Sequence, residues 1–246
     1  MDRMLYVAMS GAKQTMLAQQ ANNHNMANVN TTGFLADLNA FRSMQAFGPG
    51  YQTRVYSMAE RSAVDFSGGF INHTGRDLDI AVEDNGFIAV TAKDGSEAYT
   101  RAGDLRMDTG GQLVTGAGLP VIGNGGPIAI PPAEKISIGS DGTISIVPIG
   151  QPASAQVVVD RIKLVNADPQ MLIKSVDGLI RHKDGVDLEA DAGLKVVSGA
   201  LHSSNVNIVE SMVNMISLAR HYEAQVKLMK TADEMDSQTD RLLQLS

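Results

Sequence analysis

The fold is decided by the stretch IVESMVNMISLARHYEAQVKLM at residues 208–229. Its apolar residues return at steps of four and three, the heptad spacing of a helix that packs along another helix. We expect one C-terminal helix over residues 205–246, about 60 Å long if it is continuous. Ser203 or Ser204 is expected to cap its start. The seam residues are Ile208, Met212, Met215, Ala219, Tyr222, Val226 and Met229.

The amino-terminal end carries a second helical pattern. Across residues 1–30, apolar side chains recur at spacings of three and four, which places them on one face of a helix. The run from Asn28 to Gly33 is rich in residues that favour turns, so we expect the helix to end there. The residues of this apolar face are Leu5, Ala8, Met9, Ala12 and Met16.

The middle of the chain has the pattern of a β-domain. Over residues 76–200, short apolar runs alternate with glycine-containing pairs that favour tight turns. Because no helical pattern interrupts them, we expect antiparallel strands. The preceding segment, 31–75, is broken by glycine and proline and is predicted as an irregular or extended connector. Strands are predicted at 78–82, 87–91, 119–122, 128–130, 136–138, 143–147 and 157–165. The turn pairs are Asp94-Gly95, Gly110-Gly111, Asp141-Gly142, Asp177-Gly178 and Asp184-Gly185.

The order helix, β-domain, helix suggests the architecture. The C-terminal segment 201–246 is too long for its whole seam to lie on a small β-domain, and the other helix is at the far end of the chain. We predict an α+β protein: a central antiparallel all-β domain flanked by N- and C-terminal helices that pair as a coiled-coil-like domain. The alternative is that both helices complete the core of a monomer. A two-helix pair is marginal in water, so we expect the ends to order on assembly.

The composition narrows the classes of function. The net charge is −7, from 20 basic and 27 acidic side chains, and aromatic residues make up 4% of the chain. Such a chain lacks the basic surface and the stacking groups of a nucleic-acid binder. The absence of cysteine excludes disulfides, thiol catalysis and thiolate metal sites. No stretch is patterned as a membrane span or a cleavable signal peptide, so we expect no membrane insertion.

Patterns for catalysis are weak. The five histidines are scattered and form no His-x-x-x-His pair. Asp77 and Asp79 flank Leu78 and are interpreted as a solvated strand face, not as paired catalytic carboxylates. Gly123-Asn124-Gly125-Gly126 precedes Pro127, which removes a backbone donor, so it is interpreted as a turn and not as a phosphate loop. We predict no catalytic, cofactor or metal site and no enzyme activity; a β-rich secreted hydrolase is the alternative.

Blocks along most of the chain resemble the flagellar rod and hook family of axial proteins. Residues 21–34, with the core Asn25-Met26-Ala27-Asn28 ahead of Gly33-Phe34, are similar to the N-terminal signature of that family. Residues 209–216 and Tyr222-Glu223 resemble its C-terminal signature. The blocks that follow in the family order between them are Thr74–Val82, Gly86-Phe87, Tyr99–Leu105, Gly111–Thr115, Pro120–Gly123, Asp141–Ser145 and Ser198–Val206.

The resemblance implies a structural subunit of the flagellar basal-body rod, which polymerises into a helical drive shaft that passes torque from motor to hook. The start of the chain and its modest length favour the proximal rod, with a distal rod or hook-type protein as the alternative. The resemblance also implies export by the flagellar type III apparatus without a cleaved signal peptide, and a place in the periplasmic rod. The implied partners are other proximal and distal rod proteins, the export apparatus, and the MS-ring or export-gate base.

The subunit interface is then expected on the terminal helices. It comprises both apolar faces together with Asn25, Ala27 and Asn28 of the N-terminal signature. A soluble binding module with coiled-coil ends stays open as a different class of function. Such a module predicts a defined small oligomer, whereas a rod subunit predicts a tube.

Overall fold

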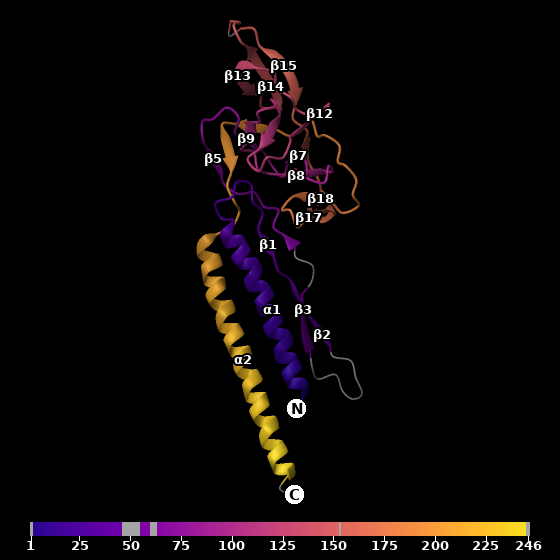
Figure 1. Cartoon of the computed structure of the whole chain (residues 1–246), viewed down its shortest axis with the longest axis vertical. Coiled ribbons are helices and arrows are strands. Elements are labelled where there is room, and N and C mark those ends of the chain that lie inside the picture. Colours follow the sequence, from indigo (N-terminus) through magenta and orange to yellow (C-terminus); the bar gives the residue numbers. More distant parts are fainter. Residues whose placement is uncertain (1, 46–54, 60–62, 153, 245–246) are drawn as a thin grey trace. The chain divides into compact units, whose positions relative to one another are not determined.

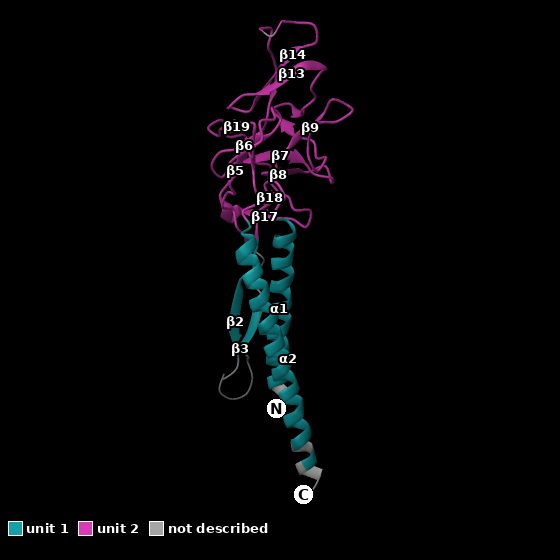
Figure 2. Ribbon diagram, turned by 90° about the vertical axis from the view of Figure 1, so that its left-hand side faces the viewer, with its two compact units in different colours: residues 1–28, 37–63, 206–246 teal, residues 29–36, 64–205 magenta. Residues whose placement is uncertain are grey.

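The computed structural model describes residues 2–45, 55–59, 63–152 and 154–244. The chain forms two compact units (Figure 2). Unit 1 comprises Met1–Asn28, Asp37–Ala63 and Val206–Ser246, and unit 2 comprises Val29–Ala36 and Val64–Asn205. The connector predicted at 31–75 is therefore shared, since its central part groups with the helices and its ends group with the β-structure.

Unit 1 consists of two long helices and a small hairpin. Helix α1 spans Asp2–Ala27 and helix α2 spans Ile208–Gln244. They contact each other in antiparallel directions (Figure 1). Strands β2 (Phe41–Gln45) and β3 (Val55–Ala59) form an antiparallel hairpin, and β3 contacts α1. The short strand β1 (Asp37–Leu38) also contacts α1.

An asparagine closes one end of each helix. The Oδ1 atom of Asn207 accepts the backbone N–H groups of Val209 (3.0 Å) and Glu210 (3.3 Å), so Asn207 caps α2. The prediction of a cap at Ser203 or Ser204 is wrong, because the helix begins later at Ile208. After α1, the backbone N–H of Asn28 donates to the carbonyl of His24 and so closes the last turn.

Unit 2 is built from antiparallel strands, which confirms the predicted α+β class. A five-stranded sheet has the order β16-β7-β8-β18-β17, and a three-stranded sheet has the order β13-β14-β15. Two-stranded ladders join β5 to β20, β6 to β19, β9 to β10 and β11 to β12. The bounds are β4 Ala63–Val64, β5 Ile71–His73, β6 Ile80–Val82, β7 Phe87–Thr91, β8 Glu97–Thr100, β9 Leu105–Met107, β10 Leu113–Thr115, β11 Ile122–Gly123, β12 Gly126–Pro127, β13 Ala133–Ile138, β14 Thr143–Pro148, β15 Val157–Arg161, β16 Leu164–Val165, η1 Pro169–Met171, β17 Leu172–Lys174, β18 Ile180–His182, β19 Val196–Ser198 and β20 Ala200–His202.

All five predicted turn pairs are tight turns. The glycine at the second position of each pair has a positive φ, between 67° and 83°, which glycine adopts without a steric penalty. In three pairs the aspartate side chain accepts the backbone N–H two residues further on, as in an Asx-turn. The predicted strands at 119–122 and 128–130 are largely isolated bridges, because Val121 and Ala129 each meet only one partner residue.

The core of unit 2 is aliphatic. Its largest cluster includes Ile80, Ile88, Leu105, Leu113 and Ile144, none of which exposes measurable surface. A second cluster surrounds Phe87 and Tyr99 and also contains Leu35 from the segment that leads into the unit. Burial of this kind supplies most of the free energy that holds a domain together, so unit 2 has its own core.

Candidate assembly surface

Small side chains line the contact between α1 and α2. On α1 the buried residues are Ala8, Ala12, Thr15 and Ala18, and on α2 they are Ser211 and Ala232. Every fully buried apolar residue in the described part of unit 1 is therefore an alanine. Alanine removes little apolar surface from water, so this contact contributes much less stabilisation than the core of unit 2 does.

One hydrogen bond and one close packing contact join the antiparallel helices. The Asn22 side chain donates to the carbonyl of Ser211 at 2.8 Å. Nearer the start of α1, Gly11 lies against the side-chain amide of Gln225, where any Cβ at residue 11 would overlap that amide. The hydroxyl of Thr15 donates to the carbonyl of Gly11 in its own helix, so it needs no hydrogen-bond acceptor on α2. The two helices can therefore approach closely with few polar groups left over.

The first turns of α2 present an apolar ridge to solvent. Ile208, Val209, Met212, Val213 and Ile216 are 42%, 66%, 46%, 61% and 54% exposed. They recur at steps of one, three and four, so they share one helix face. Soluble monomers rarely leave such a continuous apolar surface uncovered, which marks the ridge as a candidate assembly surface.

The predicted seam residues divide between the helix contact and the surface. Ala8 and Ala12 are buried in the helix contact, whereas Leu5, Met9 and Met16 are exposed by 37%, 53% and 64%. On α2 the partly buried seam residues are Met215, Ala219, Val226 and Met229, and the exposed ones are Ile208, Met212 and Tyr222. The larger apolar members of the α1 pattern are thus exposed, and its small members are buried. Whether the helix contact has coiled-coil geometry stays a prediction.

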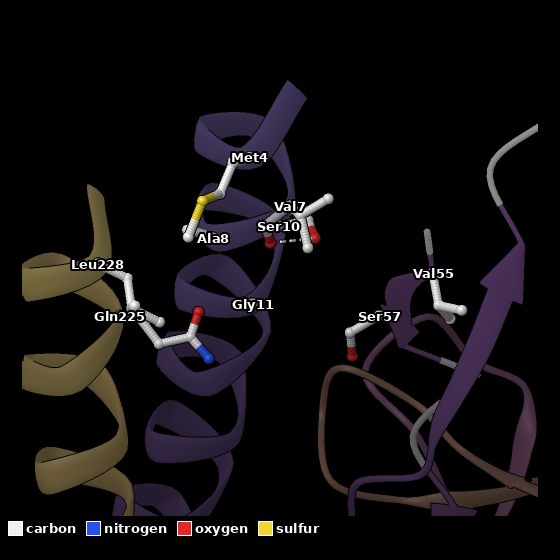
Figure 3. A pocket seen from close by; sticks show the side chains of 9 residues that line it. All are labelled: Met4, Val7, Ala8, Ser10, Gly11, Val55, Ser57, Gln225 and Leu228. Atoms are coloured by element: carbon white, nitrogen blue, oxygen red, sulfur yellow. Dashed lines mark hydrogen bonds between the residues drawn. The ribbon is translucent and has the colours of Figure 1, made fainter. Parts of the chain in front are cut away.

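A groove of about 270 Å³ lies within unit 1 between α1, α2 and β3 (Figure 3). Its wall is mostly apolar, and none of the described residues that line it is charged. Gly11 lies at the groove, in line with the close approach of the helices there. Its lining residues are Met4, Val7, Ala8, Ser10, Gly11, Val55, Ser57, Gln225 and Leu228.

The β2–β3 hairpin adds further exposed apolar side chains to unit 1. Arg42 pairs with Met58 and Met44 pairs with Tyr56, so these residues share one face. Met44 and Met58 are 41% and 42% exposed. An isolated two-stranded hairpin is at best marginally stable in water. The hairpin therefore also depends on contacts from outside its own strands.

Asn25 holds the start of the segment that contains the hairpin. Its Nδ2 donates to the carbonyl of Asp37 and its Oδ1 accepts the backbone N–H of Asp37, both at 2.8 Å. The Nδ1 atom of His24 lies 2.8 Å from the Asp37 carboxylate, and Asn28 donates to the carbonyl of His24. Asn25 and Asn28 therefore have partners within their own chain, while Ala27 is exposed. Their predicted role in subunit contacts stays a prediction.

The residues of unit 2 that were weighed as catalytic or phosphate-binding groups have structural roles. Asp79 is 5% exposed and forms an ion pair with Arg76 at 2.9 Å and a hydrogen bond with Thr74 at 2.6 Å. The interpretation of Asp79 as part of a solvated face is therefore wrong, because Thr74 and Arg76 fold back over it. Asn124-Gly125 is the turn of the β11–β12 hairpin, as predicted. In the described ranges no cluster of three or more histidine, aspartate or glutamate side chains could hold a metal ion.

Two buried polar side chains were missed by the sequence analysis. The Nε2 atom of His202 lies 2.7 Å from the carbonyl of Val82. Arg101 is 3% exposed, and its guanidinium lies 4.7 Å from the centre of the Phe87 ring. Burial lowers the pKa of Arg101, although the charge of Asp65 partly offsets this effect. Both residues lie in blocks that resemble the axial family, and that resemblance was the only signal for them.

Two family models match parts of the chain. Residues 81–146 match the "Flagellar hook protein FlgE/F/G D1 domain", and residues 197–242 match the "Flagellar basal body rod FlgEFG protein C-terminal". The first match covers most of β6 to β14, and the second covers β20 and almost all of α2, including the ridge. No helix in the part of the chain that the structure describes is long and apolar enough to cross a membrane.

Full-length relatives extend these matches. The chain is 40% identical to the flagellar basal-body rod protein FlgF of Salmonella typhimurium, over 100% of both chains. The chain belongs to the FlgF family of flagellar basal-body rod proteins. The FlgF protein of Escherichia coli is also 40% identical over 100% of both chains. A FlgG rod protein, from Bacillus subtilis, is 32% identical over 96% of this chain and 97% of its own. The family resemblance of the sequence is thus confirmed, and identity is higher to these FlgF relatives.

Proposed function

We propose that this chain is a structural subunit of the flagellar basal-body rod and that it assembles through unit 1. The observation that carries the proposal is that unit 1 buries small apolar side chains and exposes large ones. This unit buries alanines and exposes the ridge of α2, the methionines of α1 and those of the hairpin. The names of the FlgF relatives support the rod as the place of assembly.

Neighbouring subunits would complete the core that unit 1 lacks. The proposed interface comprises the predicted seam residues of both helices, extended by Val209, Val213 and Ile216 of the ridge. Apolar faces at different positions on one subunit favour head-to-tail contacts, which generate open helical assemblies. Methionine side chains are flexible and adapt to non-identical neighbours, as a rod made of several related proteins requires. In such an assembly α1 and α2 would form a coiled-coil-like inner wall.

Within the rod, we assign the protein to the proximal part. The identity to these FlgF relatives, which is higher than that to the FlgG protein of Bacillus subtilis, supports it over the distal rod. We assign to the protein a periplasmic rod position, reached through the flagellar type III apparatus without a cleaved signal peptide. Its proposed partners are proximal and distal rod proteins and the MS-ring or export-gate base. The proposed role is mechanical and not catalytic, because a drive shaft requires stiffness and not turnover.

A matched pair of charge substitutions tests the assembly surface. Val213 in the ridge is 61% exposed, and Val186 in unit 2 is 62% exposed. Val213→Asp places a charge in an interface that excludes water, whereas Val186→Asp places the same charge on a surface that stays in water. In a strain without its own copy of the protein, we expect Val213→Asp to abolish incorporation into purified basal bodies and Val186→Asp to incorporate normally.

Further measurements separate a failed interface from a failed fold or failed export. The isolated Val213→Asp protein should unfold with the same Tm as the wild type, because Val213 contributes nothing to the core of unit 2. The variant should also appear in the exported fraction. Normal incorporation of Val213→Asp would refute the assembly surface. A defined small oligomer of the wild type in solution, with no incorporation into basal bodies, would favour a binding module.

A further inference from the structure

Arg101 is a buried cation with incomplete hydrogen bonding. Its Nη2 atom donates to Oδ1 of Asn85 at 3.3 Å, while its Nε and Nη1 atoms have no hydrogen-bond partner among the residues that the structure describes. The ring of Phe87 covers the guanidinium. A buried guanidinium is stabilised best by a carboxylate, and the side chain that it reaches is a neutral amide.

Asn85 is followed by Gly86, the sequence in which an asparagine most readily cyclises. Glycine has no side chain to hinder the approach of its backbone nitrogen to the side-chain carbon of the preceding asparagine. Within the described residues, the nitrogen of Gly86 donates a long hydrogen bond, 3.4 Å, to the carbonyl of Glu83 and to no other backbone carbonyl. The chain has one other Asn-Gly pair, Asn124-Gly125, in the exposed turn between β11 and β12.

We propose that Asn85 is a self-modification site, at which Arg101 promotes conversion of the asparagine to aspartate. The Gly86 backbone nitrogen loses its proton and bonds to Cγ of Asn85. The bond from Cγ to Nδ2 then breaks, and ammonia leaves. Water opens the resulting succinimide ring to give a carboxylate at residue 85. One water molecule is consumed and one ammonia molecule is released for each conversion.

Arg101 contributes at both ends of this reaction. Negative charge develops on Oδ1 when the nitrogen attacks, and Nη2 already donates to that oxygen. A donor placed where charge develops lowers the barrier, as in an oxyanion hole. After the reaction the new carboxylate accepts charge-assisted hydrogen bonds from the guanidinium. The product state thus adds an ion pair with residue 85 to a buried cation whose charge Asp65 offsets only in part.

The strand that follows Gly86 favours the normal aspartate product over isoaspartate. Phe87 is 2% exposed and pairs with Val165 of β16, and Ile88 pairs with Leu164 and with Thr100 of β8. Isoaspartate would lengthen the backbone just before these contacts and would shift the register of β7. Opening of the ring toward aspartate leaves the register unchanged.

Peptide mass spectrometry of the purified full-length protein tests the proposal. Trypsin releases Asn85 in the peptide 77–93 and Asn124 in the peptide 107–135, so one digest reports on both sites. During incubation in mildly alkaline buffer, we expect Asn85 to convert several-fold faster than Asn124. Arg101→Gln should slow conversion at Asn85 and leave the rate at Asn124 unchanged. Conversion of Asn85 no faster than that of Asn124 would overturn the proposal.

A stability measurement keeps the test decisive if Arg101→Gln fails to fold. Asn85→Asp supplies the product carboxylate directly and should raise Tm by about 2–4 °C, as expected for a modest gain in a chain of this size. Wild-type protein aged until Asn85 has converted should unfold at the same raised temperature. A lower Tm for Asn85→Asp than for the fresh wild type would contradict the proposed ion pair.

Discussion

Gly11 of α1 lies against the side-chain amide of Gln225 of α2, with no room for a Cβ between them. The atoms in the way are the far end of a flexible side chain and not backbone. The contact therefore limits the size of residue 11 without forbidding every side chain. This relationship separates two substitutions that would otherwise appear similar.

Gly11→Ala should be tolerated, whereas Gly11→Phe should not. In the alanine variant Gln225 can rotate away, and the higher helix propensity of alanine offsets this change by up to about 1 kcal/mol. A phenylalanine would force the helices apart over the groove lined by Met4 and Leu228. Incorporation into purified basal bodies is the measurement, with normal export of both variants as the control. Equal incorporation of the two variants would contradict the close helix contact.

Gly103→Ala should destabilise unit 2 strongly, with Gly110→Ala as a matched control. A Cβ on Gly103 would collide with the backbone carbonyl of Ile80, whereas one on Gly110 meets no atom of the described residues within 4 Å. Relief of the collision requires a backbone shift that costs at least about 1–3 kcal/mol, while the control should stay within about 0.5 kcal/mol of wild type. Urea unfolding of the full chain provides both values. A Gly103→Ala protein as stable as its control would contradict the packing of β6.

Acid should weaken the turn at Asp141. Hydrogen bonds from the hydroxyl and the backbone N–H of Thr143 hold the pKa of this carboxyl below its ordinary value of 3.8. A carboxyl with a lowered folded-state pKa contributes stability above its unfolded pKa and loses it as pH falls through the folded pKa. The contribution should therefore begin to fall near pH 3.8 and be lost as pH drops through the lower folded-state pKa. In thermal melts, the Tm of Asp141→Asn should fall less steeply with decreasing pH over this range than the Tm of the wild type. An identical dependence of Tm on pH in the two proteins would contradict the assignment.

Asn25→Asp should loosen the hairpin segment of unit 1. The aspartate keeps an acceptor for the N–H of Asp37 but loses the Nδ2 donor, and it places a negative charge beside the carbonyl and carboxylate of Asp37. We expect faster amide hydrogen exchange in residues 37–45 of the assembled protein. Asn23→Asp is a suitable control, because Asn23 is exposed on the same helix. Equal exchange in the two variants would show that Asn25 does not hold this segment.

The features that the sequence predicted well are those with a local cause. The heptad steps gave a C-terminal helix that runs over Ile208–Gln244. Three of the four Asp-Gly pairs became Asx-turns because the side chain that accepts the hydrogen bond and the glycine that adopts positive φ are adjacent in the chain. The α+β class followed from these two signals.

The features that were missed depend on partners distant in the chain or on small side chains. The face of α1 that contacts α2 is built around Ala8, Ala12 and Ala18, which add little to a hydrophobic pattern that Met9 and Met16 dominate. Every described side chain of β2 and β3 is exposed or half-exposed, so these strands show no clean alternation of buried and exposed residues. Burial of Asp79 depends on a turn that brings Thr74 and Arg76 over it.

The antiparallel direction of α1 and α2 has a practical consequence for labelling. The start of α1 lies beside the later turns of α2, so a tag fused to either terminus enters the same end of the helix pair. A label at the start of α1 would lie close to the groove, which Met4 and Leu228 line. The turns at Gly95 and Gly110 in unit 2, where an added Cβ meets nothing within 4 Å, are better insertion points for probes.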